Sequence, residues 1–217
     1  MKKTCIIFDF DGVLVESESK SFVFLADTLL AKHKIVLDPK LAPSKVGMPT
    51  SVFIEKNLSD RLSVQEMKEL YQLYKKATIE NIEKYITPHE QVIDFIRSAS
   101  VAYTIGIASM NTTLYLEAVL EYFDLTKAVT KLLSRDDVER NKPDPEIYFS
   151  MLQALHCTAK QAIVLEDSLP GVEAANRANI DCLGVLNEYN ARQDFSSVNT
   201  VGLIHVDRFA DEIARHL

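Results

Sequence analysis

Six short runs of apolar residues recur along the chain, and longer stretches with helical periodicity separate them. This alternation is typical of a sheet whose strands are joined by helices, and an unbroken apolar run indicates a strand that is buried on both faces. We therefore predict an α/β fold with one doubly wound, mostly parallel, Rossmann-like sheet. The six strands are expected within residues 4–10, 102–108, 127–133, 161–165, 181–186 and 201–206.

Residues 17–85 differ from the rest of the chain, because they show helical periodicity and no convincing strand pattern. Ser63 stands three residues before Glu66, which is the spacing of a capping box at the start of a helix. We predict an all-helical domain that is inserted after the first strand. The expected domains are residues 17–85 for the insert, and residues 1–16 and 86–217 for the core.

Proline and capping residues mark three further helix starts. Thr87-Pro88 with Glu90 has a capping-box spacing, and Asp144 precedes a proline. Pro170 stands at the second position of the helical stretch 169–178. Because proline is favoured in the first turn of a helix, we predict that a helix begins at each of these places.

Composition and charge exclude several classes of function. The 217 residues include 24 Lys+Arg and 31 Asp+Glu, which gives a formal net charge of −7. This balance disfavours nucleic acid and anionic membranes as partners, and no apolar run approaches membrane-spanning length. Three widely spaced cysteines show no metal-binding pattern and are predicted to be buried or inert thiols. We expect a cytoplasmic protein that is a monomer or a weak dimer.

Polar residues follow several of the predicted strands, at the sheet edge where open parallel sheets bind ligands. They are Asp9, Asp11, Ser109, Asn111, Glu166 and Asp167, with the apolar Met110 between Ser109 and Asn111, and Lys142 precedes one of the predicted helices. A lone Asp-x-Asp-Gly is more often a turn, but its agreement with the other strand ends favours a site. Four carboxylates at one edge repel one another unless a cation is present, so we predict that Asp9, Asp11, Glu166 and Asp167 bind Mg²⁺.

Four segments of the chain occur in the order of known family motifs. They are FDFDGVLV at 8–15, IAS at 107–109, NKPDPEIY at 141–148 and VLEDSLPGVEAA at 164–175. On these motifs the chain resembles the haloacid dehalogenase (HAD) superfamily of phosphohydrolases, in the branch of β-phosphoglucomutase and phosphoglycolate phosphatase. The resemblance implies a HAD core with an inserted helical cap.

The resemblance also implies roles for the acidic residues. Asp9 is expected to be the nucleophile that takes the phosphoryl group, and Asp11 to protonate the leaving oxygen and then to activate water. The expected metal ligands are the Asp9 carboxylate, the main-chain carbonyl of Asp11 and Asp167, with Glu166 helping to place metal-bound water. Ser109 and Lys142 are expected to hold the phosphoryl oxygens. Further substrate contacts are predicted for Met110, Asn111 and Lys45.

Several functions are compatible with such a site. The first is a Mg²⁺-dependent phosphatase that hydrolyses a small phosphomonoester, such as a sugar phosphate or a similar metabolite, through an aspartyl-phosphate. The alternative is a β-phosphoglucomutase-like phosphosugar mutase, but mutase relatives carry an arginine where Met48 stands and a histidine at the position of Ser21. A haloacid dehalogenase proper lacks the acid at Asp11. The non-enzyme alternative is a catalytically silent protein that binds a phosphorylated ligand, and a two-component receiver domain is disfavoured because receivers have no helical insert.

Overall fold

The computed structural model describes residues 2–45, 50–188, 190 and 194–217. The chain forms two compact units, and one of them contains a six-stranded sheet. The strand order is β5-β4-β1-β6-β7-β8, and each pair of neighbours is parallel. The strands are β1 (Cys5–Phe8), β4 (Thr104–Ala108), β5 (Lys131–Leu133), β6 (Ala162–Glu166), β7 (Asp181–Leu186) and β8 (Gly202–His205). The predicted doubly wound parallel sheet is confirmed.

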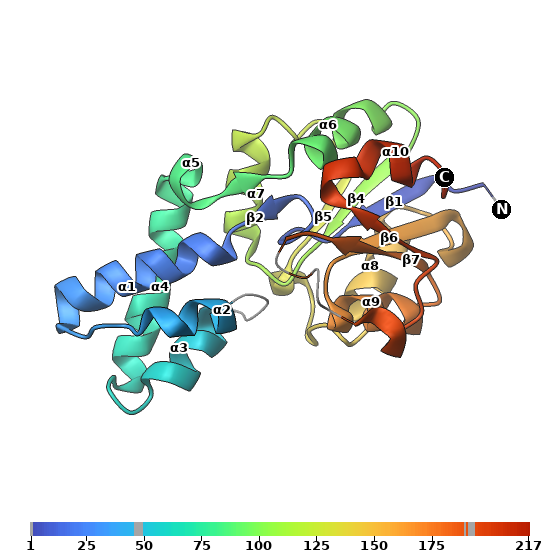
Figure 1. The fold of residues 1–217 in the computed structure, drawn as a ribbon. Helices are drawn as coiled ribbons and strands as arrows, with labels where there is room; N and C mark the ends of the chain where they lie inside the picture. The colour runs from blue at the N-terminus through green and yellow to red at the C-terminus, as the bar shows by residue number, and fades with distance from the viewer. Residues whose placement is uncertain (1, 46–49, 189, 191–193) are drawn as a thin grey trace. The chain divides into compact units, whose positions relative to one another are not determined.

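Helices cover both faces of this sheet (Figure 1). Alternate side chains of a strand point to opposite faces, so the two faces of β1 have different neighbours. Phe8 contacts Phe95 of α6 and Phe209 of α10, whereas Ile7 belongs to a buried cluster with α8 and α9. The helices of this unit are α6 (Glu90–Ala99), α7 (Thr113–Tyr122), α8 (Glu146–Ala154), α9 (Leu169–Arg177) and α10 (Phe209–Ile213), with short 3-10 helices η2 (Arg135–Asp137), η3 (Ala159–Gln161), η4 (Phe195–Ser197) and η5 (Val206–Arg208).

The predicted helix starts are correct in part. Pro170 lies in the first turn of α9, and Asp144 accepts a hydrogen bond from the N–H of Glu146, where α8 begins. The start predicted at Thr87 is wrong, because Thr87–Pro88 forms strand β3 and α6 begins only at Glu90. Pairing with a distant strand thus overrides a local capping signal.

The second compact unit comprises Glu16–Thr87 and has its own apolar core. Phe24 contacts both Tyr74 and Tyr85, with ring centroids 5.6 Å apart in each pair. The capping box at Ser63 and Glu66 is confirmed at the start of α4. The elements are α1 (Glu18–His33), η1 (Pro39–Leu41), α2 (Ala42–Lys45), α3 (Thr50–Leu58), α4 (Val64–Glu80) and α5 (Ile82–Tyr85).

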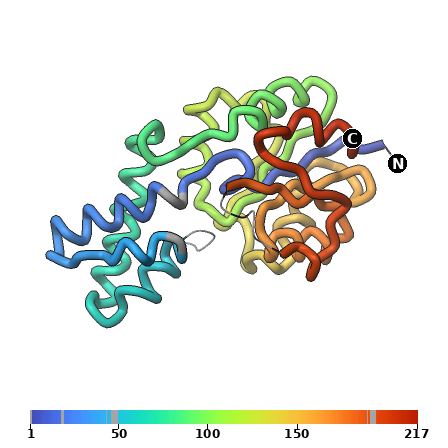
Figure 2. Tube along the Cα trace, in the orientation of Figure 1, coloured from blue at the N-terminus to red at the C-terminus, as the bar shows by residue number. Residues whose placement is uncertain are grey.

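The chain crosses between the two units twice, once at β2 (Val15–Glu16) and once at β3 (Thr87–Pro88), and these two strands pair with each other. Both crossings can be followed along the tube in Figure 2. The N–H of His89 donates to the carbonyl of Leu14, so the two connections are tied together at the α/β unit. The other unit, Met1–Val15 and Pro88–Leu217, is therefore made of two segments that are far apart in sequence.

Two expectations from composition can be compared with this fold. Among the helices of the described residues, none has both the length and the apolar character needed to cross a membrane. Cys5, Cys157 and Cys182 are free thiols. Burial raises the pKa of Cys157 to about 12 and that of Cys182 well above its ordinary value, so the reactive thiolate is rare near neutral pH.

Candidate active site at the carboxyl edge of the sheet

Asp9 follows the central strand β1 directly and is held there by the backbone. Its N–H donates to the carbonyl of Leu165 on β6, at 2.9 Å. The chain then turns sharply at Gly12, which has a φ of 83°. A Cβ at Gly12 would lie 1.9 Å from Oδ2 of Asp167, so only glycine fits this close approach. The sequence Asp-x-Asp-Gly therefore places Asp9 at the edge of the sheet and beside Asp167.

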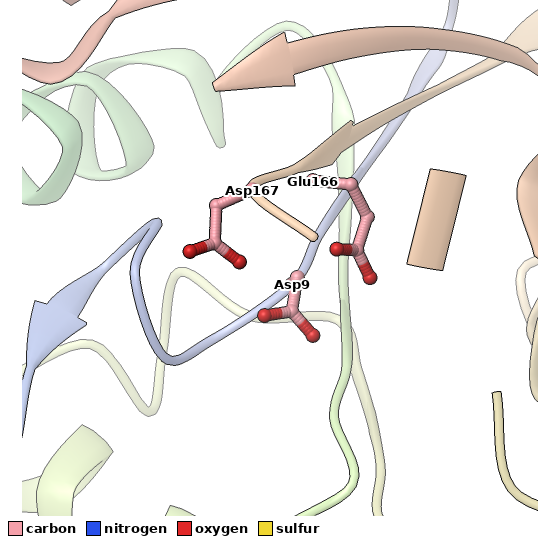
Figure 3. Close-up of side chains that lie close together, drawn as sticks. All are labelled: Asp9, Glu166 and Asp167. Carbon is pink, nitrogen blue, oxygen red and sulfur yellow. The ribbon is translucent and has the colours of Figure 1, made fainter. Parts of the chain in front are cut away.

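Three carboxylates gather at this edge (Figure 3). Asp9, Glu166 and Asp167 each offer an oxygen, and these three atoms lie within 4.8 Å of one another. Burial is the largest effect on Asp9 and the charge of Glu166 the next, and together they raise its pKa to about 7, although Lys142 lowers it. The cluster therefore carries negative charge that a cation would stabilise.

Lys142 lies inside this acidic cluster. Its Nζ donates to Oδ1 of Asp9 at 2.6 Å, to Oε1 of Glu166 at 2.5 Å and to the carbonyl of Ala108 at 2.9 Å. Burial alone would lower the pKa of Lys142, but the charges of Asp9 and Glu166 outweigh it and raise that pKa above its ordinary value. The lysine is therefore a fixed positive charge at the Asp9 carboxylate.

Glu166 is fully buried, and both of its carboxylate oxygens are occupied. Oε1 accepts from Lys142 and from the hydroxyl of Tyr148 at 3.1 Å, while Oε2 accepts from the N–H and the hydroxyl of Ser168. A Cβ at Gly171 would lie 1.8 Å from Oε1, so the first turn of α9 needs glycine there. These bonds hold Glu166 firmly next to Lys142.

The carboxylate of Asp11 has different neighbours from that of Asp9. Its Oδ2 accepts from Nδ2 of Asn111, and its Oδ1 accepts from the hydroxyl of Tyr115 at 3.4 Å. Both donors belong to the chain after β4, at the adjacent strand end. The structure therefore holds the side chain of Asp11 by two neutral donors.

The predicted substrate contacts lie in two places. Ser109 follows β4, is buried, and accepts a hydrogen bond from the N–H of Asn111, while Met110 packs at the edge of the apolar cluster. Lys45 ends α2 in the other unit, and its side chain is 1% exposed. Met48 and its neighbours, which bear on the choice between phosphatase and mutase, lie outside the described residues.

Four residues of the site escaped the sequence analysis. Tyr115 and Tyr148 are on helices and reach Asp11 and Glu166 through their hydroxyl groups. Asn187 and Asn190 follow β7, and Nδ2 of Asn187 donates to Asp167. Asn187 is the first polar residue after an apolar run, so the rule that selected Asp9 also selects Asn187.

The residues at this edge suit a divalent cation. Their donors are carboxylate oxygens, which magnesium and calcium prefer, and the missing Cβ at Gly12 lets the Asp167 carboxylate lie at this edge. Among the described residues, these three form the group of acidic, histidine or cysteine side chains close enough to share an ion. The chemistry of the donors therefore fits a hard divalent cation.

Residues 6–185, which include every motif of the α/β unit described above, match the family model for haloacid dehalogenase-like hydrolases. The chain belongs to the haloacid dehalogenase-like hydrolase family. The resemblance seen in the four motifs is thereby confirmed, since the match runs through Asp9, Ser109, Lys142 and Asp167.

This haloacid dehalogenase-like hydrolase has relatives that are named as phosphatases. It is 28% identical to validoxylamine A 7′-phosphate phosphatase of Streptomyces hygroscopicus subsp. limoneus, over 85% of this chain and 86% of that one. It is 27% identical to the phosphorylated carbohydrates phosphatase of Thermotoga maritima, over 92% and 93%. Its fold matches CbbY of Rhodobacter sphaeroides, crystallised in complex with phosphate, with a TM-score of 0.78, 21% identity and 93% of each chain covered.

Proposed function

We propose that the protein is a Mg²⁺-dependent phosphatase that hydrolyses a small phosphomonoester through an aspartyl-phosphate on Asp9. The observation that carries the proposal is the place of Asp9, which lies at the end of the central strand, 2.6 Å from a buried ammonium group and among further carboxylates. The family is one of hydrolases, and two relatives are named as phosphatases, one of validoxylamine A 7′-phosphate and the other of phosphorylated carbohydrates. A sugar phosphate or a similar metabolite is therefore the proposed class of substrate.

In the proposed mechanism, a carboxylate oxygen of Asp9 attacks phosphorus while Asp11 gives a proton to the leaving oxygen. Asp11 then takes a proton from the water that attacks the aspartyl-phosphate, which releases inorganic phosphate and restores Asp9. Ser109 and Lys142 donate hydrogen bonds to the phosphoryl oxygens, and Lys142 does so by redirecting one of the three N–H groups that contact Asp9, Glu166 and Ala108 in the free protein. Such transfer depends mainly on positioning and charge stabilisation, which fixed donors around an in-line nucleophile provide.

The proposed metal ligands are the carboxylates of Asp9 and Asp167 and the main-chain carbonyl of Asp11. A bound Mg²⁺ would neutralise charge on the phosphoryl group and on the acidic cluster. Glu166 stays close to these ligands, and its oxygens hold Lys142 and Ser168. Glu166 therefore also holds the ammonium group of Lys142 in place beside Asp9, in addition to its predicted role beside the metal.

We propose that the unit Glu16–Thr87 acts as a cap that selects the substrate. Its two connections to the α/β unit form the short β2–β3 pair, and short connections of this kind suit movement as a body. Lys45 is the proposed contact from this unit to the substrate.

A panel of phosphomonoesters tests the proposed function by measuring phosphate release from purified protein with Mg²⁺. Sugar phosphates, phosphoglycolate and an aryl phosphate are the first compounds to compare. The panel includes β-glucose 1-phosphate with a catalytic amount of the 1,6-bisphosphate, from which we expect phosphate and no appreciable glucose 6-phosphate. Isomerisation that outpaces phosphate release would show a mutase, and no turnover of any ester would favour a silent binding protein.

Binding of Mg²⁺ is expected to weaken as the pH falls through about 7. Burial, and next the charge of Glu166, raise the pKa of Asp9 to about 7 in the metal-free protein, and a protonated carboxyl group is a poor ligand. The Mg²⁺ concentration for half-maximal aryl phosphate hydrolysis should therefore rise about tenfold from pH 8 to pH 6. A half-saturation that does not change with pH contradicts this, and full activity in excess EDTA contradicts the metal site itself.

Asn111→Ala is expected to lower kcat/KM for the hydrolysis of alkyl phosphates by about tenfold or more. The loss should be much smaller for an aryl phosphate with a good leaving group. Asn111 and Tyr115 hold the Asp11 carboxylate, and a poor leaving group depends most on the proton that Asp11 gives. The measurement is kcat/KM for esters whose leaving groups differ in pKa. An equal loss for all esters would contradict this role through Asp11 and would favour a direct contact of Asn111 with the substrate, which is the role predicted from the sequence.

A further inference from the structure

Asn187 and Asn190 form a reciprocal pair immediately after β7. The N–H of Asn187 donates to Oδ1 of Asn190 at 2.8 Å, and the N–H of Asn190 donates to Oδ1 of Asn187 at 2.9 Å. Both side chains are buried, with 2% and 9% exposed. Because each amide oxygen accepts from the partner's backbone, the amide nitrogens must point away from the pair.

The two amide nitrogens point at the strand ends of the active site. Nδ2 of Asn187 donates to the carbonyl of Gly12 at 2.9 Å and to Oδ2 of Asp167 at 3.3 Å. Nδ2 of Asn190 donates to the main-chain carbonyls of Asp167 and Val185, at 2.9 and 2.8 Å. The pair therefore connects the chain after β1, β6 and β7.

We propose that Asn187, oriented by Asn190, is a positioning residue for the divalent cation site. It fixes the direction of the Asp167 carboxylate and the position of the turn at Gly12, which approach each other closely. The inference rests on the proposed metal-dependent phosphatase function, and it adds a residue outside the ligands and the catalytic groups.

The chemistry of the side chain supports this role. A neutral amide directs a carboxylate without cancelling the negative charge that attracts a cation, whereas a lysine would compete with the cation. An aspartate at position 187 would have no proton to give to Gly12 or Asp167 and would repel the Asp167 carboxylate. Partners that orient metal ligands typically contribute 10-fold to 100-fold to metal affinity.

Asn176 supplies a matched control in the same unit. Its Nδ2 donates to the carbonyl of Asn199 at 2.8 Å, and its Oδ1 accepts from the N–H of Asn199 at 2.9 Å. This amide also bridges backbone groups in both directions, but it lies on α9 and does not contact the acidic cluster through any of these bonds. Asn176→Ala therefore removes similar hydrogen bonds without touching Asp167.

The experiment measures Mn²⁺ binding to the full chain by electron paramagnetic resonance of the free ion, together with Mg²⁺ titration of aryl phosphate hydrolysis. Asn187→Ala should weaken Mn²⁺ binding about tenfold or more and raise the half-saturating Mg²⁺ concentration by a similar factor. Much of the lost activity should return at saturating Mg²⁺. Asn176→Ala should bind Mn²⁺ as tightly as the wild type.

If Asn187→Ala does not fold, Asn190→Ala serves as the test variant. It removes the side chain that orients Asn187 and should weaken Mn²⁺ binding several-fold. If folded Asn187→Ala, or Asn190→Ala in its place, binds Mn²⁺ as tightly as the wild type, this inference is wrong and the proposed function is unaffected. A wild-type protein that binds no Mn²⁺ and hydrolyses esters in excess EDTA would instead overturn the proposed function, and this inference with it.

Discussion

Replacing Asp9 by asparagine is expected to reduce turnover by at least about 10⁴-fold, because the substitution removes the proposed nucleophile. Asparagine has the shape of aspartate, so the bond from the Asp9 N–H to Leu165 and the turn at Gly12 should persist. The measurement is phosphate release from an aryl phosphate at saturating Mg²⁺, with mass spectrometry of acid-quenched protein to detect a bound phosphoryl group. The wild type should show the phosphoryl adduct and Asp9→Asn should not.

A stability measurement separates this loss from unfolding. The pKa of Asp9 is raised from 3.8 to about 7 on folding. Asp9 therefore stabilises the folded metal-free protein below about pH 4, and this stabilisation is lost as the pH rises through about 7. At pH 8 the neutral Asp9→Asn should therefore be at least as stable to heat as the metal-free wild type. Asp94→Asn, at an exposed aspartate on α6 that pairs with Arg97, is the matched control and should keep its activity. Turnover of Asp9→Asn at the wild-type rate would refute the covalent mechanism.

Lys142→Ala is expected to lower kcat by about 10²-fold to 10³-fold, the usual effect of losing a fixed donor that stabilises the transition state. Its Nζ is the cation that contacts both Asp9 and Glu166, and its side chain is only 5% exposed. The measurement is steady-state hydrolysis of the aryl phosphate at saturating Mg²⁺. Lys160→Ala, at an exposed lysine before β6, is the control and should leave kcat unchanged.

The same substitution should destabilise the metal-free protein, because it leaves Glu166 buried without its cation. Removing one partner of a buried ion pair typically costs about 3–5 kcal/mol of unfolding free energy. Denaturant unfolding in EDTA measures this loss, and Mg²⁺ should restore part of it. Lys142→Met keeps much of the apolar stem and should show the same loss of kcat with better packing. A kcat within tenfold of the wild type in both variants would exclude Lys142 from the reaction.

The sequence predicts the sheet and much of the site because parallel strands bring distant residues to one edge. Asp9, Glu166 and Asp167 each come directly after a buried run, and the structure places their oxygens together. Tyr148 has the spacing of an ordinary residue on the apolar face of α8. Nothing in the local sequence therefore indicates that its hydroxyl group donates a hydrogen bond to Glu166 on β6. Thr87 has the spacing of a helix cap, yet its pairing in β3 depends on residues near Val15. What the sequence misses is therefore set by contacts between distant segments.

The central position of β1 also has a consequence for the order in which the chain becomes structured during synthesis. Cys5 of β1 pairs with Thr104 of β4 and with Ala162 of β6, so both of its neighbours leave the ribosome long after it does. The contiguous segment Glu16–Thr87 has contacts that are nearer in sequence and is complete much earlier. Closing such long loops is slow, and an unpaired apolar strand is prone to aggregate. The nascent chain therefore has no partner for β1 until β4 has been made, and Asp9, the proposed nucleophile, has no complete site until β6 has been made.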